Sequence, residues 1–264
     1  VAWSAGLGAI SRQWKTSASA AKRATIVASG SQESDLHRMR LWYSPKQNRR
    51  QVGADRGCIS QLALYANCVI LGPMRPAVFI DRDGVICHNR ADYVKRWDEF
   101  AFLPGALEAL ARLARSPFAI VIITNQSGIN RGRVTLEAVE DIHRRMLRVI
   151  EQAGGRVDAL YICPHRPDEG CTCRKPLPGL LHRAAAELGL DLAQSYLIGD
   201  ALEDIQAACA AGCQPYLVLT GRGQAHRAQA EHALPGRFQV VHDLGEAVEA
   251  ILRLTPPPLM PLAR

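Results

Sequence analysis

From residue 77 onward, short apolar runs alternate with longer segments in which apolar residues recur every three or four positions. The short runs predict buried strands, and the longer period predicts helices with one apolar face. The expected strands are Ala77–Ile80, Ala119–Ile123, Ala159–Ile162, Tyr196–Ile198, Tyr216–Leu219 and Phe238–Val241. The expected helices are Gly105–Arg115, Leu136–Gln152, Gly179–Leu188, Leu202–Ala211 and Gly245–Leu254. This alternation predicts an α/β fold with a mainly parallel sheet and right-handed helical crossovers.

The ends of the chain do not follow this pattern. Residues 1–73 are rich in Ser, Ala, Gln and Arg, and only Leu62–Leu71 forms a good apolar run. We expect a disordered or weakly ordered extension there, one domain over 74–254, and a loose proline-rich tail over 255–264. Because the chain begins with Val and Met74 directly precedes the first strand, either Met74 is the native start or the extension is native.

The charge is unevenly distributed along the chain. The formal net charge is +7, but residues 1–75 hold 11 basic and 3 acidic residues, whereas 76–264 hold 21 and 22. A basic extension could bind nucleic acid or a membrane surface, but the nearly neutral domain is not expected to bind nucleic acid. No apolar run reaches the length of a membrane span and no secretory signal is evident, which predicts a cytoplasmic protein without a membrane partner.

Two aspartates stand where the first strand ends, in Asp81-Arg-Asp83-Gly84. In open α/β sheets, chemistry gathers at the carboxyl ends of the strands. Crowded carboxylates need a cation or a proton between them, and Mg²⁺ is the simplest occupant. Asp81 is a candidate nucleophile and Asp83 a candidate proton donor and acceptor. The alternative is a solvated acidic turn.

Further polar residues follow other predicted strands. Hydrogen-bonding side chains at Thr124, Asn125, Gln126 and Ser127 suit a phosphate group, although a capped strand-to-helix turn would use the same residue types. Asp200 follows another strand and would complete an oxygen site for Mg²⁺. Glu203 and Asp204 begin the next helix, where favourable interaction with the helix dipole explains them better than metal binding.

A cysteine and histidine cluster predicts a closed, structural zinc site. Three thiols and one imidazole within eleven residues match a Cys₃His tetrahedron, and the alternatives are a redox pair or unrelated free thiols. The ligands would be Cys163, His165, Cys171 and Cys173. The other five thiols, which are scattered and expected to be free, are Cys58, Cys68, Cys87, Cys209 and Cys213. Arg174 and Lys175 follow the last ligand, so a metal-bound loop would aim them as a phosphate clamp, unless they form an exposed basic pair.

Taken in order, these motifs resemble those of the HAD superfamily of phosphatases. The matching pieces are Asp81-x-Asp83-Gly-Val, Thr124-Asn-Gln-Ser, Lys175 and Gly199-Asp200. The cysteine and histidine loop is similar to the zinc-containing branch, which includes D-glycero-D-manno-heptose 1,7-bisphosphate 7-phosphatases and histidinol-phosphatase domains. The resemblance is close over about residues 76–223, and it implies a Rossmann-like fold without a large cap domain.

The resemblance also implies roles for individual residues. Asp81 would form an aspartyl phosphate, and Asp83 would protonate the leaving alkoxide and then activate water. Mg²⁺ would be held by Asp81, the backbone carbonyl of Asp83 and Asp200. Thr124 and Lys175 would bind the transferring phosphoryl group. The positions that match a substrate-binding rim are Tyr93, Asn125, Gln126, Ser127 and Arg174.

Two departures leave the substrate open. Ala201 stands where the heptose enzymes usually carry Lys, and the segment 87–93 differs from their substrate loop. We expect a monomeric Mg²⁺-dependent phosphomonoesterase acting on a small phosphorylated metabolite, with heptose bisphosphate favoured over histidinol phosphate or another sugar phosphate. Alternatives of other classes are a nucleic-acid-binding protein with a DNA-end phosphatase domain and a zinc-stabilised binding module without turnover.

Overall fold

A single parallel sheet organises the computed structural model, which describes residues 74–254. Its strands are β1 (Ala77–Ile80), β2 (Ala119–Asn125), β3 (Ala159–Cys163), β4 (Tyr196–Gly199), β5 (Gln214–Val218) and β6 (Gln239–Val241). They lie in the order β3-β2-β1-β4-β5-β6, and every neighbouring pair is parallel. The predictions for 1–73 and 255–264 lie outside the described residues.

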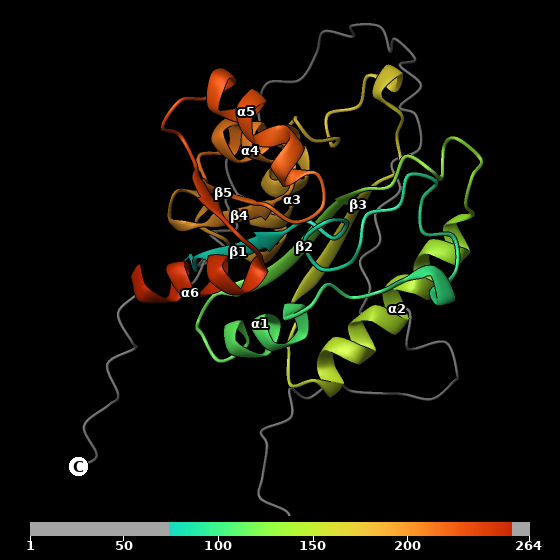
Figure 1. Ribbon diagram of the computed structural model, residues 1–264, viewed down its shortest axis with the longest axis horizontal. Coiled ribbons are helices and arrows are strands. Elements are labelled where there is room, and N and C mark those ends of the chain that lie inside the picture. Colours follow the sequence, from blue (N-terminus) through green and yellow to red (C-terminus); the bar gives the residue numbers. More distant parts are fainter. Residues whose placement is uncertain (1–73, 255–264) are drawn as a thin grey trace, which may run out of the picture. The chain divides into compact units, whose positions relative to one another are not determined.

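Helices cover both faces of the sheet (Figure 1). One face packs against α1 (Ala106–Leu113), α2 (Leu136–Gln152) and α6 (Leu244–Leu254). The other packs against α3 (Gly179–Leu188) and α4 (Leu202–Ala211), and α5 (Gly223–Ala233) packs on α4 and β5. Because successive strand side chains point to opposite faces, Val78 and Ile80 enter one core while Ala77 and Phe79 enter the other. The predicted α/β class with a Rossmann-like topology is confirmed.

Most predicted elements occur within one or two residues of their expected ends, and α5 is the one α-helix among residues 74–254 that the pattern missed. Its sequence is Gly-Gln-Ala-His-Arg-Ala-Gln-Ala-Glu-His-Ala, and only Gly223 and Ala230 are buried. It therefore has no wide apolar stripe to reveal its period. β5 begins two residues earlier than predicted, because Pro215 takes a place in the ladder beside Leu197 of β4.

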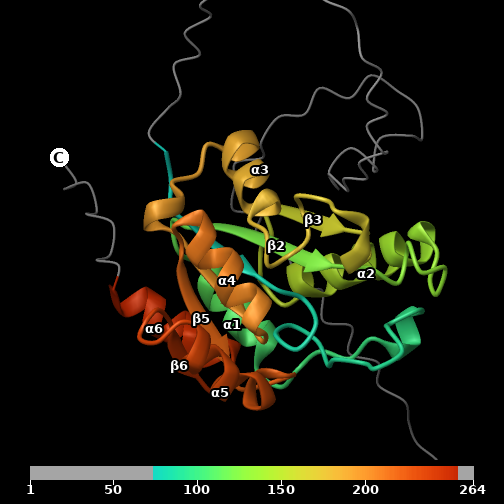
Figure 2. The same ribbon diagram turned by 90° about the horizontal axis from the view of Figure 1, so that it is seen from above.

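The longest connections leave the carboxyl edge of the sheet. Residues 81–105 follow β1 and residues 164–178 follow β3, and each holds only a short 3-10 helix, at Trp97–Glu99 and Pro167–Glu169. Figure 2 shows the teal segment after β1 on the side to which the arrows of β2 and β3 point. The part of the chain that the structure describes therefore has no large cap domain.

Among residues 74–254, no helix combines the length and the apolar character needed to cross a bilayer.

Candidate active site

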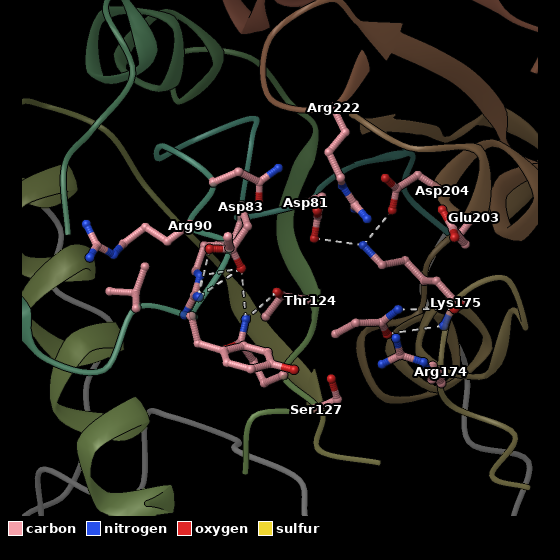
Figure 3. A pocket seen from close by; sticks show the side chains of 17 residues that line it. Asp81, Asp83, Arg90, Thr124, Ser127, Arg174, Lys175, Glu203, Asp204 and Arg222 are labelled. Carbon is pink, nitrogen blue, oxygen red and sulfur yellow. Dashed lines mark hydrogen bonds and ion pairs between the residues drawn. The ribbon is translucent and has the colours of Figure 1, made fainter. Parts of the chain in front are cut away.

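The carboxyl ends of β1, β2 and β4 meet where the strand order changes direction. β2 lies on one side of β1 and β4 on the other, which opens a crevice beyond the three strand ends. Asp81 is the first residue after β1, and its backbone N–H still donates to the carbonyl oxygen of Ile198 on β4 at 2.9 Å. Asp81 lines a cavity of about 380 Å³ at this point (Figure 3).

Lys175 extends into this cavity between two carboxylates. Its Nζ donates to Asp81 Oδ1 at 2.7 Å and lies 2.6 Å from Asp204 Oδ1 (Figure 3). A third acceptor, the carbonyl oxygen of Ile123, lies at 3.2 Å. The three protons of the ammonium therefore each have an acceptor, and the side chains of Asp81, Lys175 and Asp204 are all buried.

Asn125, the last residue of β2, determines where Lys175 lies. Its Nδ2 donates to the carbonyl oxygen of Lys175 at 3.1 Å, and its Oδ1 accepts from the backbone N–H of Lys175 at 3.2 Å. The sequence suggested Asn125 as a substrate contact, and it does line the cavity. Both ends of its amide are engaged by the Lys175 backbone, however, so its evident role is to hold the lysine in place.

Burial dominates the electrostatics of these groups. It raises the pKa of Asp81 to about 6, although the Lys175 ammonium opposes the shift. Burial also raises the pKa of Asp204, again against Lys175. Against the effect of burial, Asp204 and Asp81 raise the pKa of Lys175, so the lysine stays charged. The site thus holds more carboxylate charge than one ammonium neutralises, which is the arrangement that favours a bound cation.

Asp200, the residue after β4, is fully buried and is not among the residues that line the cavity. Its Oδ2 accepts from Asn89 Nδ2 at 2.6 Å and from the backbone N–H of Arg222 at 2.8 Å. Its Oδ1 accepts from Arg222 Nη2 at 3.1 Å. Sequence reasoning missed both partners, and their one signal was their place in the loops that follow β1 and β5.

Two glycines make room for Asp200. Gly84 has a φ of 84°, and a Cβ there would lie 2.1 Å from Asp200 Oδ2. Gly221 approaches from the loop after β5, with a φ of 58° and a Cβ position 2.3 Å from the same oxygen. Both positions need glycine for the backbone angle and for the close contact.

Asp83 lies on another wall of the cavity, where its carboxylate is fixed from two sides. Arg82 Nη2 donates to Asp83 Oδ1 at 2.9 Å and to Oδ2 at 2.8 Å. Gln126 Nε2 donates to Asp83 Oδ2 at 3.0 Å and to Thr124 Oγ1 at 2.8 Å. The candidate acid–base residue and the candidate phosphate-binding threonine are therefore joined through Gln126.

The cavity brings together residues that the sequence singled out in three separate segments. Those that line it are Asp81, Asp83, Tyr93, Thr124, Asn125, Gln126, Ser127, Arg174 and Lys175. Tyr93 has a φ of 59°, the one left-handed non-glycine residue among 74–254. Gly128 allows this geometry, since a Cβ there would lie 3.1 Å from the Tyr93 ring. Backbone strain of this kind is common where a side chain must face a ligand.

Three carboxylates form a donor set that suits a hard divalent cation. One oxygen each of Asp81, Asp200 and Asp204 lies within 4.8 Å of the others. All-oxygen ligands with this charge fit Mg²⁺. Asp83, to which the resemblance assigns a metal contact through its backbone carbonyl, is not among these three carboxylates, and its side chain is engaged by Arg82. Asp204, which the sequence assigned to the helix dipole, belongs to the carboxylate group.

The predicted zinc ligands also lie together, at the end of β3 and in the loop after it. Cys163 Sγ lies 3.3 Å from Cys173 Sγ, 3.7 Å from Cys171 Sγ and 3.5 Å from His165 Nδ1. A tetrahedron with Zn–S bonds of about 2.3 Å separates its sulfurs by about 3.8 Å. The four groups therefore fit a zinc ion. Of the scattered thiols, Cys87, Cys209 and Cys213 are free, and Cys58 and Cys68 lie outside the described residues.

Replacement of Cys171 by Ser is expected to remove the zinc and to destabilise the loop that carries Lys175. A structural site loses most of its affinity with one of its four ligands. Zinc content of the purified protein, measured by atomic spectrometry, should fall from about one ion per chain to near zero. Cys209→Ser is the matched control, because this free thiol lies outside the cluster. Full zinc content in Cys171→Ser would show that the cluster is not a metal site.

Behind Asp83, Arg82 contacts a histidine of α2. Arg82 Nη1 lies 2.8 Å from His143 Nε2, and both side chains are buried, with relative exposures of 2% and 0%. Burial lowers the pKa of His143 well below its usual range, and the Arg82 charge lowers it further. The imidazole is therefore neutral in the folded protein. Neither residue had a functional signal in the sequence.

The neutral His143 predicts a loss of stability in acid. The unfolded chain binds a proton at this residue below about pH 6.5, whereas the folded chain does not. The free energy of unfolding should therefore fall by up to about 1.4 kcal/mol for each pH unit below that value. Urea titrations between about pH 6.5 and 5, compared with His143→Gln, isolate this contribution. Equal slopes for the two proteins would contradict it.

Comparisons with known proteins agree with the geometry. The family model described as HAD-hydrolase-like matches residues 172–247. A D-glycero-beta-D-manno-heptose-1,7-bisphosphate 7-phosphatase of Bordetella bronchiseptica is 44% identical over 67% of this chain and 97% of its own length. The enzyme of that name from Pseudomonas aeruginosa is 39% identical over 68% of this chain and 99% of its own length.

A solved structure shows the same arrangement of elements. The crystal structure of D,D-heptose 1,7-bisphosphate phosphatase from B. bronchiseptica, complexed with magnesium and phosphate, has a TM-score of 0.65. It is 43% identical and covers 68% of this chain and 99% of that one. On these matches, the chain belongs to the family of HAD-like phosphatases that contains the D-glycero-beta-D-manno-heptose-1,7-bisphosphate 7-phosphatases.

Proposed function

We propose that this protein is a Mg²⁺-dependent phosphomonoesterase that removes the 7-phosphate of D-glycero-D-manno-heptose 1,7-bisphosphate. The observation that carries the proposal is the buried contact between Asp81 and Lys175 at the wall of the cavity, 2.7 Å long. This contact supports the proposal because it joins the candidate nucleophile to the candidate phosphate-binding cation, and Asp83 lines the same cavity. The choice of heptose 1,7-bisphosphate as substrate follows the names of the two bacterial relatives, which this chain matches over 97% and 99% of their length.

The proposed reaction has two displacements at phosphorus. In the first, an Asp81 oxygen bonds to phosphorus, the bond from phosphorus to the sugar oxygen breaks, and Asp83 gives its proton to that oxygen. In the second, water attacks the aspartyl phosphate, Asp83 takes the water proton, and phosphate leaves as the Asp81 carboxylate is restored. Lys175 and Thr124 hold the phosphoryl oxygens, where charge must be offset in both steps.

Mg²⁺ and zinc have different roles in this proposal. Asp81, Asp200 and the backbone carbonyl of Asp83 would hold Mg²⁺, with Asp204 beside them, and bound Mg²⁺ supplies positive charge for the phosphoryl group. Zinc at the cysteine cluster would be structural, because four protein ligands leave no open position. Its role is to fix the loop that delivers Arg174 and Lys175. Arg174 is itself tied to this loop, since its Nη1 donates to the carbonyl oxygen of His165 at 3.2 Å.

Substrate turnover tests the proposal directly. Phosphate release would be measured with heptose 1,7-bisphosphate, histidinol phosphate, other sugar phosphates and a 5′-phosphorylated oligonucleotide, each with and without Mg²⁺. The highest kcat/KM is expected for the heptose bisphosphate, and only with Mg²⁺. A higher value for histidinol phosphate would reassign the substrate, and one for the oligonucleotide would favour DNA-end repair. Release that is equal with and without Mg²⁺ would overturn the proposal.

The second phosphate of the substrate has a candidate partner in Arg174, which lines the cavity. If Arg174 binds it, Arg174→Ala should raise KM for the bisphosphate but not for a monophosphate. Equal KM values for the wild type and the variant would argue against this contact. We further propose that the enzyme acts as a monomer in the cytoplasm, where phosphorylated sugars are found.

A further inference from the structure

A series of buried polar contacts connects α2 to the cavity. His143 on α2 contacts Arg82, and Arg82 in turn holds both carboxylate oxygens of Asp83. Arg82 and His143 are 61 positions apart in sequence. The Arg82 side chain is among the largest fully buried side chains in residues 74–254. Arg82 and Asp83 both line the cavity, whereas His143 is not among its lining residues.

Elementary chemistry sets the direction of these hydrogen bonds. A guanidinium has only donors, so His143 Nε2 must accept from Arg82 Nη1. The ring proton is then on Nδ1, which is buried and has no hydrogen-bond partner. Arg82 consequently donates to His143 on one side and to Asp83 on the other. The planar guanidinium cannot rotate without losing one of these contacts.

The position of His143 is unusual for a purely structural residue. The other buried residues of α2, namely Val139, Ile142, Met146 and Ile150, are all apolar. A leucine at position 143 would continue this face and leave no unpaired Nδ1–H in the core. An imidazole there incurs the cost of a buried unsatisfied donor. The contact that offsets this cost is the hydrogen bond that His143 Nε2 accepts from Arg82.

We propose that His143 is a positioning residue, which acts through Arg82 to fix the carboxylate of Asp83 in the orientation that proton transfer requires. This inference rests on the proposed function, in which Asp83 protonates the leaving oxygen. A general acid must lie within hydrogen-bond reach of the atom that it protonates, so a tilt of the carboxylate slows the step. Without the acceptor at position 143, Arg82 would be free to turn and to carry Asp83 with it.

A comparison of two leaving groups tests this role. A sugar alkoxide needs a proton to leave, whereas p-nitrophenolate leaves without one, and kcat/KM reports the steps up to its departure. His143→Leu should lower kcat/KM for heptose bisphosphate by about 10-fold or more and the value for p-nitrophenyl phosphate much less. His143→Gln, which keeps an acceptor, should restore most of the loss. Met146→Ala, a buried α2 residue outside the chain of contacts, should leave the ratio of the two values unchanged.

The outcomes separate the inference from the proposed function. An equal loss on both substrates, or no loss on either, in a folded His143→Leu protein would overturn the positioning role while wild-type turnover stands. If wild-type protein released no phosphate from the heptose bisphosphate, the proposed function would fail and the inference with it. Should His143→Leu not fold, Arg82→Lys provides the same test, because lysine keeps the charge but cannot hold Asp83 and His143 together. An unchanged substrate ratio in Arg82→Lys would likewise overturn the role.

Discussion

Replacement of Asp81 by Asn is expected to abolish phosphate release while the protein stays folded. An amide oxygen at this position still accepts from Lys175, which preserves the contact seen at 2.7 Å. An amide is not a competent nucleophile, however, so no aspartyl phosphate can form. The loss in kcat should reach at least about 10⁴-fold, the size found when a covalent nucleophile is removed. Phosphate release from heptose bisphosphate under saturating Mg²⁺ measures it.

Two controls make the Asp81 result specific. Asp141→Asn removes a carboxylate from the surface of α2, where it pairs with Arg144 and Arg145, and should keep full activity. Rapid quenching of wild-type turnover should capture a protein whose mass has risen by one phosphoryl group, and Asp81→Asn should show no such species. Substantial residual turnover in Asp81→Asn would refute the assignment of the nucleophile.

The candidate site residues that sequence reasoning singled out share one physical origin. Asp81, Thr124 and Asp200 each follow an apolar run, and parallel strands bring their carboxyl ends to one edge. Knowing the strands was therefore enough to group these side chains. The candidate zinc ligands were equally visible, because Cys163, His165, Cys171 and Cys173 lie close together in the sequence itself.

Other residues of the site could not be predicted, because their important contacts are with residues far away in the sequence. Asp204 illustrates this: its Oδ2 accepts from the backbone N–H of Ala201 at 3.0 Å, as an acid at a helix start should. Its Oδ1 faces Lys175 from a distant segment, and no local pattern reports that contact. Arg222 and His143 were missed for the same reason, since their partners are 22 and 61 positions away. The helix α5 escaped because its alanines and glutamines lack an apolar period.

Replacement of Lys175 by Met should affect both rate and stability. Loss of the ammonium removes a charge that offsets the phosphoryl oxygens, which is expected to lower kcat by about 10²–10³-fold. In the wild type, the lysine contacts Asp81 at 2.7 Å and Asp204 at 2.6 Å. The substitution removes both contacts and leaves the two buried carboxylates without a cation between them. Breaking a buried ion pair by removing one partner costs about 3–5 kcal/mol in the free energy of unfolding. Urea denaturation at neutral pH measures this loss.

The pH dependence identifies the cause of the Lys175→Met loss. Burial already raises the pKa of Asp81 and Asp204, and without the ammonium both values should rise further. The folded variant then binds protons more readily than its unfolded chain, so its stability should recover as the pH falls toward about 4. Arg145→Met is the matched control, because it breaks an exposed ion pair of 2.8 Å with Asp141; such pairs contribute at most about 1 kcal/mol. If Lys175→Met lost no more stability than this control, Lys175 would not be the group that stabilises the buried carboxylates of Asp81 and Asp204. Another group would then have to offset their charge.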